Sequence, residues 1–578
     1  MSWKETYQKW NQFAGLETEL KEELTALAND EKAAEEAFYK ELEFGTGGMR
    51  GEIGVGTNRM NVYTVRKASQ GFADFIKAEG AEAVAQGIVI AHDSRHYSPE
   101  FALEAAKTLA SNGIKAYLFD GLRPTPELSF AVRELRAAGG IVITASHNPP
   151  EYNGYKVYGN DGGQLPPKEA DDLVSYVDQV ADELSIELEA EEVLRANGLI
   201  VRVGEQLDDA YQEQLKTIRV LPTIQDELTA PLKIVFTPLH GTGLVPVTVG
   251  LKNYGFEHVT VVEEQAEPDG AFPTVSSPNP EEHAAFKLAI EYGDRVDADV
   301  LLATDPDADR VGVATRDADG EWVVLTGNQT GALLLDYILS QKAAQGTLPK
   351  NGFVAKTIVT SELGALIARH YDLHVENTLT GFKFIGEKIK QYNESGEYEY
   401  LFGYEESYGY LIGDFCRDKD AVQACLLAAE MTAYHKKEGR TLYEALQAIY
   451  EQFGYFEESL RSLTLKGKDG VAQIGRIMDT FREHPPKQVA GEKVVLFEDY
   501  DASISHDLVQ HQPSPINLPK SNVLKFTLED GSWFCLRPSG TEPKIKFYFS
   551  VTSPDAAETT RKRQMIEDEV MQEVEQIQ

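Results

Sequence analysis

Short apolar runs that lead into longer amphipathic segments recur along most of the chain. Continuous apolar runs are typical of strands buried on both faces of a sheet, and apolar residues at 3.6-residue spacing are typical of helices. The alternation predicts α/β domains whose sheets are covered by helices. The runs that carry this pattern are GIVIAHD (87–93), KAYLFDG (115–121), GGIVITAS (139–146), LKIVFTPLHG (232–241), HVTVVEE (258–264), ADVLLATDPD (298–307) and GFVAKTIVTS (352–361).

The two ends of the chain differ from this pattern. Residues 1–40 are rich in Glu, Lys, Ala and Leu at helical spacing, which predicts helices. Residues 523–551 contain closely spaced strand patterns and an Asp-Gly turn, which predict an antiparallel sheet, followed by a helical tail. Breaks in the pattern near 205, 325 and 455 predict four domains: 1–205, 206–325, 326–455 and 456–578.

Three of the predicted strands end in polar clusters. The clusters are Ser146-His147-Asn148, the stretch Asp305 to Arg310, and Gly403-Tyr404-Glu405-Glu406-Ser407. Open α/β sheets bind ligands at the carboxyl ends of their strands. We therefore expect the three clusters to meet in one cleft.

Charge and cysteine usage narrow the class of protein. The 578 residues carry a formal net charge of −38, with 55 basic against 93 acidic residues. Such a surface repels nucleic acid and anionic membranes, so we expect neither as a partner. Three cysteines without a CxxC pattern, no secretory signal and no apolar run of about 20 residues predict a cytoplasmic protein.

The alternating carboxylates Asp305, Asp307 and Asp309 are the clearest candidate metal ligands. In an extended or gently curled segment all three point to one side, where their mutual repulsion calls for a cation. Oxygen ligands favour Mg²⁺. An EF-hand does not fit, because Arg310 and Arg316 stand where that loop needs glycine and an acid. A haloacid-dehalogenase motif does not fit at Asp309, and a solvated acidic turn is the structural alternative.

Ser146 is a candidate nucleophile. The hydrolase elbow G-x-S-x-G lacks both glycines here, and adjacent side chains on an extended segment point to opposite faces, so His147 is poorly placed as its base. A phosphoserine beside a divalent cation fits better, and a turn-capping serine is the alternative. Two further loops are suited to anions: Arg537 to Pro543, with Gly540 as backbone donor, and the glycine-rich stretch Phe44 to Gly51.

Four motifs in this order, TASHNP, DPDADR, GYEESYG and RPSGTEP, resemble the α-D-phosphohexomutase superfamily, and the resemblance spans essentially the whole chain. It is closest to the phosphoglucomutase branch that includes phosphopentomutase-active members. FGTGGMRG, HDSR, TPLHGTG, TGFKFIG and RDKDA strengthen it. The resemblance implies three related α/β domains with mixed sheets around a central cleft, plus a C-terminal α+β domain resembling the TATA-binding-protein fold.

The resemblance also implies site roles. Ser146 would be the phosphorylated serine, and would bind Mg²⁺, one per chain, together with Asp305, Asp307 and Asp309. Lys419, on a matching motif, would be a general acid–base with a lowered pKa; a surface ion pair is its structural alternative. Residues implied to line the reaction centre or bind substrate are Arg50, His147, Arg310, Thr380, Gly381, Lys383, Glu405, Ser407, Arg537, Ser539, Gly540 and Thr541.

The implied activity is interconversion of glucose 1-phosphate and glucose 6-phosphate by an isomerase, with glucose 1,6-bisphosphate as activator. Phosphopentomutase and phosphomannomutase activities are the alternatives; Tyr410 stands where phosphomannomutases of this superfamily typically carry a histidine. A non-catalytic sugar-phosphate sensor and a metal-dependent phosphatase are alternatives from other classes. The resemblance suggests a monomer or weak homo-oligomer. His240 is expected to be a core or loop histidine bonded to backbone.

Overall fold

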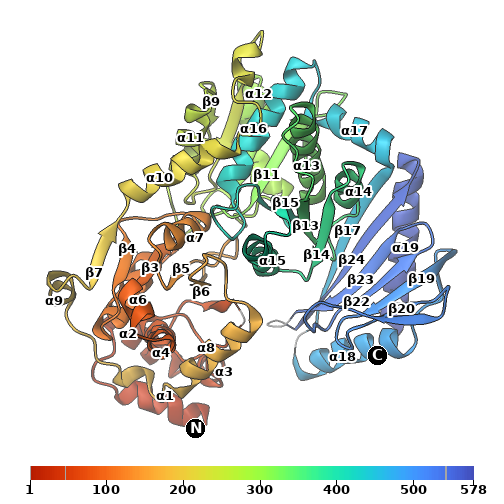
Figure 1. The fold of residues 1–578 in the computed structure, drawn as a ribbon. Helices are drawn as coiled ribbons and strands as arrows, with labels where there is room; N and C mark the ends of the chain where they lie inside the picture. Colours follow the sequence, from red (N-terminus) through yellow and green to blue (C-terminus); the bar gives the residue numbers. More distant parts are fainter. Residues whose placement is uncertain (1, 46, 466, 540–542, 578) are drawn as a thin grey trace. The chain divides into compact units, whose positions relative to one another are not determined.

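The computed structural model describes residues 2–45, 47–465, 467–539 and 543–577 (Figure 1). The chain divides into two compact units: the first comprises residues 1–327 and 382–441, and the second 328–381 and 442–578. Among the described residues, no helix is both long enough and apolar enough to cross a membrane.

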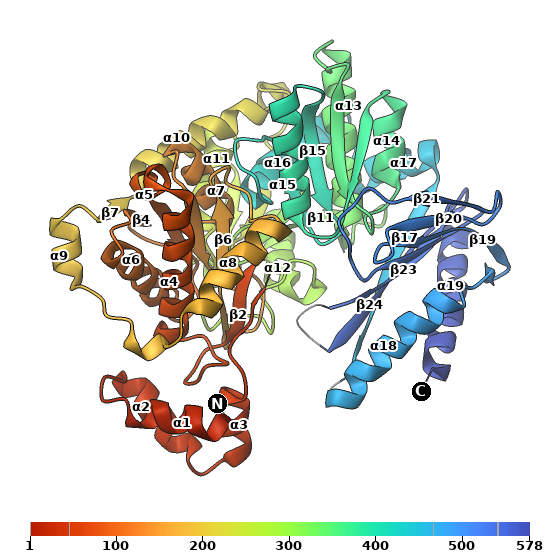
Figure 2. The ribbon, with the colours of Figure 1, turned by 60° about the horizontal axis from the view of Figure 1, so that its bottom comes forward.

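Three helices open the chain, as the sequence predicts, and lie together at one end of the first unit (Figure 2). Trp10 anchors them: its ring packs edge-on against Phe38 and Tyr63, and its Nε1–H donates to Glu183 Oε1 over 2.8 Å. The buried indole therefore has a polar partner for its only donor. The helices are α1 (Trp3–Gln12), α2 (Thr18–Leu27) and α3 (Glu31–Phe38).

A mixed seven-stranded sheet follows, in the order β1-β2-β6-β5-β3-β4-β7. Strands β3, β4, β5 and β7 are parallel, and β5–β6, β6–β2 and β2–β1 are antiparallel. The strands are β1 (Phe44–Gly45), β2 (Gly48–Glu52), β3 (Ile88–His92), β4 (Ala116–Phe119), β5 (Gly139–Ile143), β6 (Tyr152–Gly159) and β7 (Ile200–Val203).

Both faces of this sheet are buried, because alternate residues of β3 enter different cores. Ile88 and Ile90 pack in the core with α4, α6 and α8, whereas Val89 and Ala91 pack in the core with α7 and α10. This explains the continuous apolar runs. The helices are α4 (Val62–Glu79), α5 (Ala81–Gln86), α6 (Ser98–Ser111), α7 (Thr125–Glu134), α8 (Pro167–Gln179), α9 (Glu191–Ala196) and α10 (Glu205–Leu215).

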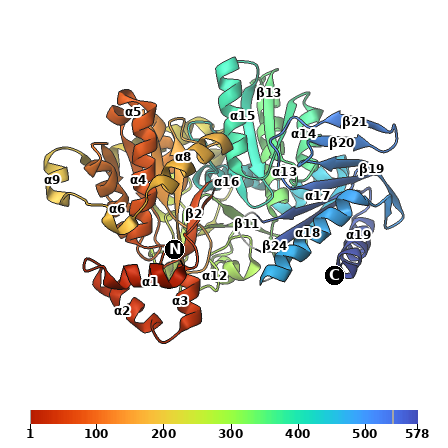
Figure 3. The same ribbon diagram turned by 90° about the horizontal axis from the view of Figure 1, so that it is seen from below.

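Helices α4 and α8 lie side by side on one face (Figure 3). A Cβ atom at Gly71 of α4 would lie 2.5 Å from the Cα atom of Val177 in α8. The glycine therefore permits the close approach of the two helices. Asn61 fixes the start of α4, since its side chain accepts hydrogen bonds from the N–H groups of Tyr63 and Thr64.

The second sheet of the first unit is also mixed, in the order β12-β11-β10-β8-β9. Its core on one side unites Val235, Leu301 and Ala314 of the sheet with Ala289 and Tyr292 of α12. The elements are β8 (Ile234–Thr237), α11 (Leu244–Asn253), β9 (Val259–Val261), α12 (Lys287–Val296), β10 (Val300–Thr304), β11 (Val311–Arg316) and β12 (Trp322–Val324).

Residues 382–441 complete the first unit. Strand β15 pairs antiparallel with β16, and the long helix α16 packs against α11 and the second sheet. Side chains along almost all of α16 are buried, consistent with its apolar sequence AVQACLLAAEM. The elements are α15 (Phe382–Ser395), β15 (Glu399–Glu405), β16 (Gly409–Leu411) and α16 (Ala421–Lys437).

The second unit begins with a helical and parallel-stranded part. Strands β13 and β14 pair in parallel over five residues. Lys356, the penultimate residue of β13, is buried, and its ammonium donates to the carbonyls of Thr357 and Thr360 and to Glu362. The elements are α13 (Gly327–Ala344), β13 (Gly352–Thr357), α14 (Leu363–His370), β14 (His374–Thr378) and α17 (Leu442–Phe453).

The C-terminal part is antiparallel, as predicted, with the strand order β17-β24-β23-β22-β19-β20-β21. The Asp530-Gly531 turn joins β22 to β23, and Leu528 N–H donates to Ser532 O over 2.7 Å. Figure 2 shows α18 and the predicted helical tail, α19, on one face. The elements are β17 (Tyr455–Thr464), α18 (Gly467–Glu483), β18 (Gln488–Val489), β19 (Glu492–Asp499), β20 (Ile504–Asp507), β21 (Gln512–Pro515), β22 (Leu524–Leu528), β23 (Trp533–Pro538), β24 (Lys544–Ser553) and α19 (Ala556–Gln576).

Phe526 is the centre of a stack of aromatic rings in this C-terminal core. Its ring centroid lies 4.9 Å from that of Phe497 and 4.7 Å from that of Phe534. We predict that Phe526→Ala lowers the free energy of unfolding of the second unit by about 3–5 kcal/mol, because it leaves a cavity there. Chemical denaturation measures the change, with Val509→Ala, at a 67% exposed side chain, as control. Equal losses in the two variants would contradict the prediction.

Candidate active site

Ser146 lies just beyond the end of β5 in a turn that is held by hydrogen bonds. Its φ angle is 50°, in the left-handed region that non-glycine residues rarely adopt. Its N–H donates to Thr144 Oγ1 over 2.8 Å, and the Thr144 hydroxyl donates to Asp93 Oδ2 over 2.6 Å. This chain of bonds stabilises the strained backbone.

Arg95, from the HDSR stretch, holds the carbonyl side of the same turn. Its fully buried guanidinium donates to the carbonyl oxygens of Ser146, Asn148, Pro149 and Tyr152. The distances to Ser146 (from Nε), Pro149 and Tyr152 are 3.2, 2.8 and 3.1 Å. Arg95 is not among the predicted site residues, since a residue 51 positions from Ser146 gives no spacing signal.

The three aspartates converge as predicted. Each offers a carboxylate oxygen within 4.8 Å of the others, and all three are at most 2% exposed. The segment is tighter than the extended or gently curled one that was expected, however: residues 305–309 form a turn in which Ala308 has a φ of 50°. The turn brings together side chains that a straight segment would space along its length. The Ser146 hydroxyl donates to Asp305 Oδ2 over 2.6 Å.

Two lysine ammoniums reach these carboxylates. Lys156 Nζ lies 2.8 Å from Asp307 Oδ2 and 3.5 Å from Asp309 Oδ2. Lys419 Nζ lies 3.1 Å from Asp309 Oδ2 and 3.2 Å from Asp418 Oδ1. Lys156 is not among the predicted site residues, although a lysine inside the mostly buried strand β6, ten residues after Ser146, is itself unusual.

The pKa values of Asp305 and Asp307 are shifted in opposite directions. Burial raises the pKa of Asp305 well above its usual value, and the neighbouring Asp307 and Asp309 raise it further. Burial acts in the same direction on Asp307, but Lys156 holds the pKa of that carboxyl well below its ordinary range. Within the described residues, Oδ1 of Asp307 and Oδ1 of Asp309 are buried without a hydrogen-bond partner. The donor set therefore fits a hard divalent cation, and the cluster is a candidate metal site.

The expected lowering of the Lys419 pKa is wrong. Burial alone would lower the pKa of this ammonium, but the carboxylates of Asp309 and Asp418 raise it above its usual value. Lys419 is only 7% exposed and is not a surface ion pair. In this arrangement its protonated form is favoured.

His147 also lies differently from the expectation. Its Nδ1 is 3.2 Å from Ser146 Oγ, because the left-handed turn at Ser146 abolishes the alternation of an extended segment. Burial lowers the pKa of His147 well below its ordinary value, and the nearby guanidiniums of Arg310 and Arg50 lower it further. The imidazole is thus neutral beside the serine oxygen.

The remaining predicted residues of the first unit lie around this centre. Arg50 of β2 donates to Asn148 Oδ1 over 3.1 Å. In the glycine-rich stretch, β1 pairs antiparallel with β2 at the edge of the sheet. Arg310 pairs with Glu281 and lies 3.8 Å from Asp309. Glu405 ends β15 as predicted, and its charge contributes to raising the pKa of Lys419, after the carboxylates of Asp309 and Asp418 and against the effect of burial.

Other predicted residues are placed as follows. Ser407 follows β15, and Lys383 lies in the first turn of α15, where burial lowers its pKa. Thr380, Gly381, Arg537 and Ser539 belong to the second unit, and Gly540 and Thr541 lie outside the described residues. His240 is a loop histidine as expected: its ring nitrogens contact Glu267 O and Thr274 Oγ1.

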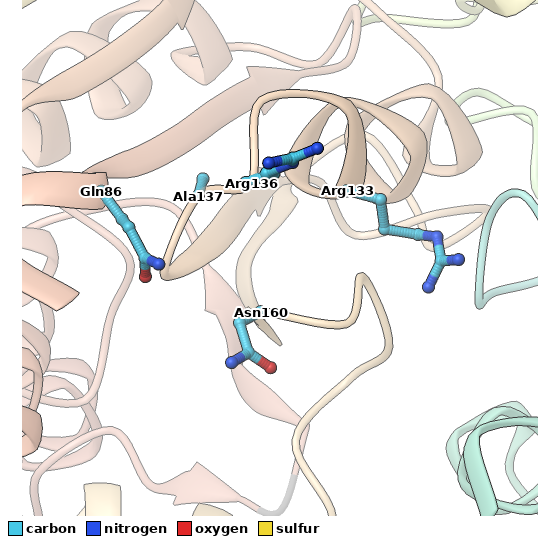
Figure 4. A pocket seen from close by; sticks show the side chains of 5 residues that line it. All are labelled: Gln86, Arg133, Arg136, Ala137 and Asn160. Atoms are coloured by element: carbon cyan, nitrogen blue, oxygen red, sulfur yellow. The ribbon is translucent and has the colours of Figure 1, made fainter. Parts of the chain in front are cut away.

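A separate polar hollow of about 300 Å³ lies in the first unit (Figure 4). Its lining comes from the residues where β3 and β5 begin and where β6 has ended, whereas Ser146 follows the end of β5. The hollow therefore lies at the opposite end of the strands from Ser146 and is not part of the candidate active site. The lining residues are Gln86, Arg133, Arg136, Ala137 and Asn160.

Comparison with known proteins connects this geometry to one family. Four family models match successive parts of the chain: the phosphoglucomutase/phosphomannomutase alpha/beta/alpha domains I (41–183), II (209–320) and III (326–453), and the C-terminal domain (464–567). A phosphoglucomutase of Staphylococcus epidermidis is 42% identical over 518 residues, which are 90% of this chain and 92% of that protein.

Solved structures share the fold. Parafusin, a phosphoglucomutase of Paramecium in an open form, matches with a TM-score of 0.67 and 18% identity, over 93% of this chain and 95% of that one. N-acetylphosphoglucosamine mutase of Aspergillus fumigatus, in complex with GlcNAc-6P and magnesium, matches with a TM-score of 0.50 and 13% identity, over 97% of this chain and 100% of that one.

We predict that Arg95→Lys loosens the serine turn, because one ammonium cannot replace a guanidinium fork that reaches four carbonyls. Amide hydrogen exchange over residues 146–152 should accelerate at least about tenfold, equivalent to about 1.4 kcal/mol of local stability. The control is Arg195→Lys, whose partner is Glu191 one helical turn away on α9. Unchanged exchange in Arg95→Lys would contradict the prediction.

Proposed function

This chain belongs to the phosphoglucomutase/phosphomannomutase family, and we propose that it interconverts glucose 1-phosphate and glucose 6-phosphate through a phosphoserine at Ser146. The observation that carries the proposal is the serine oxygen held 2.6 Å from Asp305 within a cluster of three buried carboxylates. A serine in that position can carry a phosphoryl group whose charge a cation balances.

The proposed reaction consists of two phosphoryl transfers. In the first, the bond from phosphorus to Ser146 Oγ breaks as phosphorus bonds the free hydroxyl oxygen of glucose 1-phosphate. That hydroxyl loses its proton to a base, and Ser146 Oγ takes up a proton. The resulting bisphosphate then reorients in the site. In the second, Ser146 Oγ loses its proton as the phosphoryl group originally on the sugar passes to it, and the sugar oxygen that this group leaves takes up a proton. The product is glucose 6-phosphate.

Lys419 is our proposed proton-transfer group. Its protonated form, which Asp309 and Asp418 favour, suits the acid half of the cycle, when the sugar oxygen leaves phosphorus. His147, neutral and 3.2 Å from Ser146 Oγ, can hold a hydrogen bond to the serine oxygen when the phosphoryl group has left. Arg50 and Arg310 would stabilise the charge on the transferring oxygens.

We propose Mg²⁺, one per chain, as the ion of the candidate metal site, with Asp305, Asp307, Asp309 and the phosphoserine as ligands. When bound, it would neutralise charge on the phosphoryl oxygens. Asp307 and Asp309 each direct Oδ2 to a lysine while Oδ1 lacks a hydrogen-bond partner within the described residues. The magnesium complex of the A. fumigatus mutase supports this choice.

Substrate contacts complete the proposal. Glu405 and Ser407 would bind sugar hydroxyls, and Arg537, Ser539, Gly540 and Thr541 the non-reacting phosphate, with Thr380, Gly381 and Lys383 as further contacts. Glucose 1,6-bisphosphate would act as activator by phosphorylating Ser146. We place the enzyme in the cytoplasm, as a monomer or weak homo-oligomer, on its cysteine usage, its acidity and the family resemblance.

Phosphopentomutase and phosphomannomutase activities remain the alternative proposals within the family. Tyr410 bears on the second of these. It is fully buried, and its hydroxyl donates to Gly327 O over 3.2 Å. This residue is therefore a packing residue, and it offers no histidine-like proton transfer.

We predict that Ser146→Ala lowers turnover of glucose 1-phosphate by at least about 10³-fold, because the phosphoryl carrier is lost. A coupled assay for glucose 6-phosphate, with Mg²⁺ and trace glucose 1,6-bisphosphate, measures the change. Ser175→Ala, an exposed serine on α8, is the control. A variant that keeps wild-type turnover would reject Ser146 as the carrier. A wild-type enzyme that isomerises ribose or mannose phosphates but not glucose 1-phosphate would reject the sugar assignment.

A further inference from the structure

The loop that carries Lys419 is held at three of its positions by side chains that come from earlier parts of the first unit. The loop, residues 416–420, lies between β16 and α16. Arg417 N–H donates to Ser129 Oγ over 2.7 Å, and Tyr211 donates to both oxygens of Asp420 over 2.8 and 2.9 Å. The third position is Asp418, immediately before Lys419.

Asp418 is 1% exposed and accepts four hydrogen bonds. Its Oδ2 accepts from the Tyr158 hydroxyl over 2.8 Å and from Gln164 Nε2 over 3.0 Å. Its Oδ1 accepts from the Lys419 N–H over 2.8 Å and from Lys419 Nζ over 3.2 Å. One oxygen thus faces the first domain and the other faces the lysine.

The rest of the Lys419 side chain is confined as well. A Cβ atom at Gly409 would lie 2.1 Å from Lys419 Cδ, so the lysine stem runs directly over that glycine. The ammonium lies 5.8 Å from the centre of the Phe382 ring and 3.1 Å from Asp309 Oδ2. Of these contacts to the ammonium, the one from Asp418 Oδ1 varies with the way that carboxylate is turned, and Tyr158 and Gln164 hold its other oxygen.

We propose that Tyr158, acting through Asp418, is a positioning residue for Lys419. The Tyr158 hydroxyl keeps Asp418 Oδ2 toward β6, and Oδ1 then holds the ammonium next to Asp309. Without this donor only Gln164 holds Oδ2, so the carboxylate turns more freely and the ammonium loses its fixed position relative to the reacting oxygen. This inference rests on the proposed role of Lys419 in proton transfer.

The test compares Tyr158→Phe with Tyr155→Phe in the glucose 1-phosphate assay. Both tyrosines are buried on β6, and the Tyr155 hydroxyl lies 3.0 Å from Ser69 Oγ on α4, away from the loop. We expect Tyr158→Phe to lower kcat about 10- to 100-fold, the cost typical of a misplaced reacting group, and to change KM less than about twofold. Tyr155→Phe should leave kcat within about twofold of wild type.

Lys419→Ala alone and combined with Tyr158→Phe completes the test. If Tyr158 acts through Lys419, Tyr158→Phe has no further effect on kcat once Lys419 is alanine. Equal kcat values for the two tyrosine variants, or independent losses in the double variant, would overturn the positioning role. An inactive wild-type enzyme would instead reject the proposed function, and a fully active Lys419→Ala enzyme would reject the role of Lys419.

Discussion

Three carboxylates gathered on one buried turn are the constraint on which the first unit depends. Like charges this close and this dry each cost several kcal/mol unless they are paired. Lys156 from the first sheet and Lys419 from the loop before α16 supply that pairing from either side. The charges therefore tie together three segments that are far apart in sequence. Within the described residues, Asp307 Oδ1 and Asp309 Oδ1 have no hydrogen-bond partner, so these two oxygens are left for a cation.

Backbone strain gathers at the same place. Ser146, Ala308 and Tyr408 all have positive φ angles, of 50°, 50° and 64°, and each lies in or beside one of the three polar strand ends. Such conformations cost about 1–3 kcal/mol each and persist where surrounding contacts fix them. At Ser146 the fixing contacts are Thr144 and Arg95. In regular strands, neighbouring side chains would point to opposite faces. The strained residues direct them toward one point instead.

Much of the fold and part of the site could be predicted from the sequence, because both depend on local pattern. The apolar runs predicted the strands β3, β5 and β10, and the Asp-Gly pair predicted a hairpin. The polar residues at the ends of the predicted strands indicated Ser146 and the aspartates as site residues. The orientation of His147 and the protonation of Lys419 could not be predicted, since a single left-handed turn and a long-range ion pair decide them. Arg95 becomes evident only once the strands are placed side by side, and so do the carboxylate partners of Lys156.

The most direct test of this account is where a divalent cation binds. Crystals of the full chain soaked in Mn²⁺ can be measured for anomalous scattering at the manganese edge, since Mn²⁺ accepts the same oxygen ligands as Mg²⁺. The account predicts one strong anomalous peak among the carboxylates of Asp305, Asp307 and Asp309, next to Ser146. A peak confined to another part of the molecule, or none at saturating Mn²⁺, would contradict it.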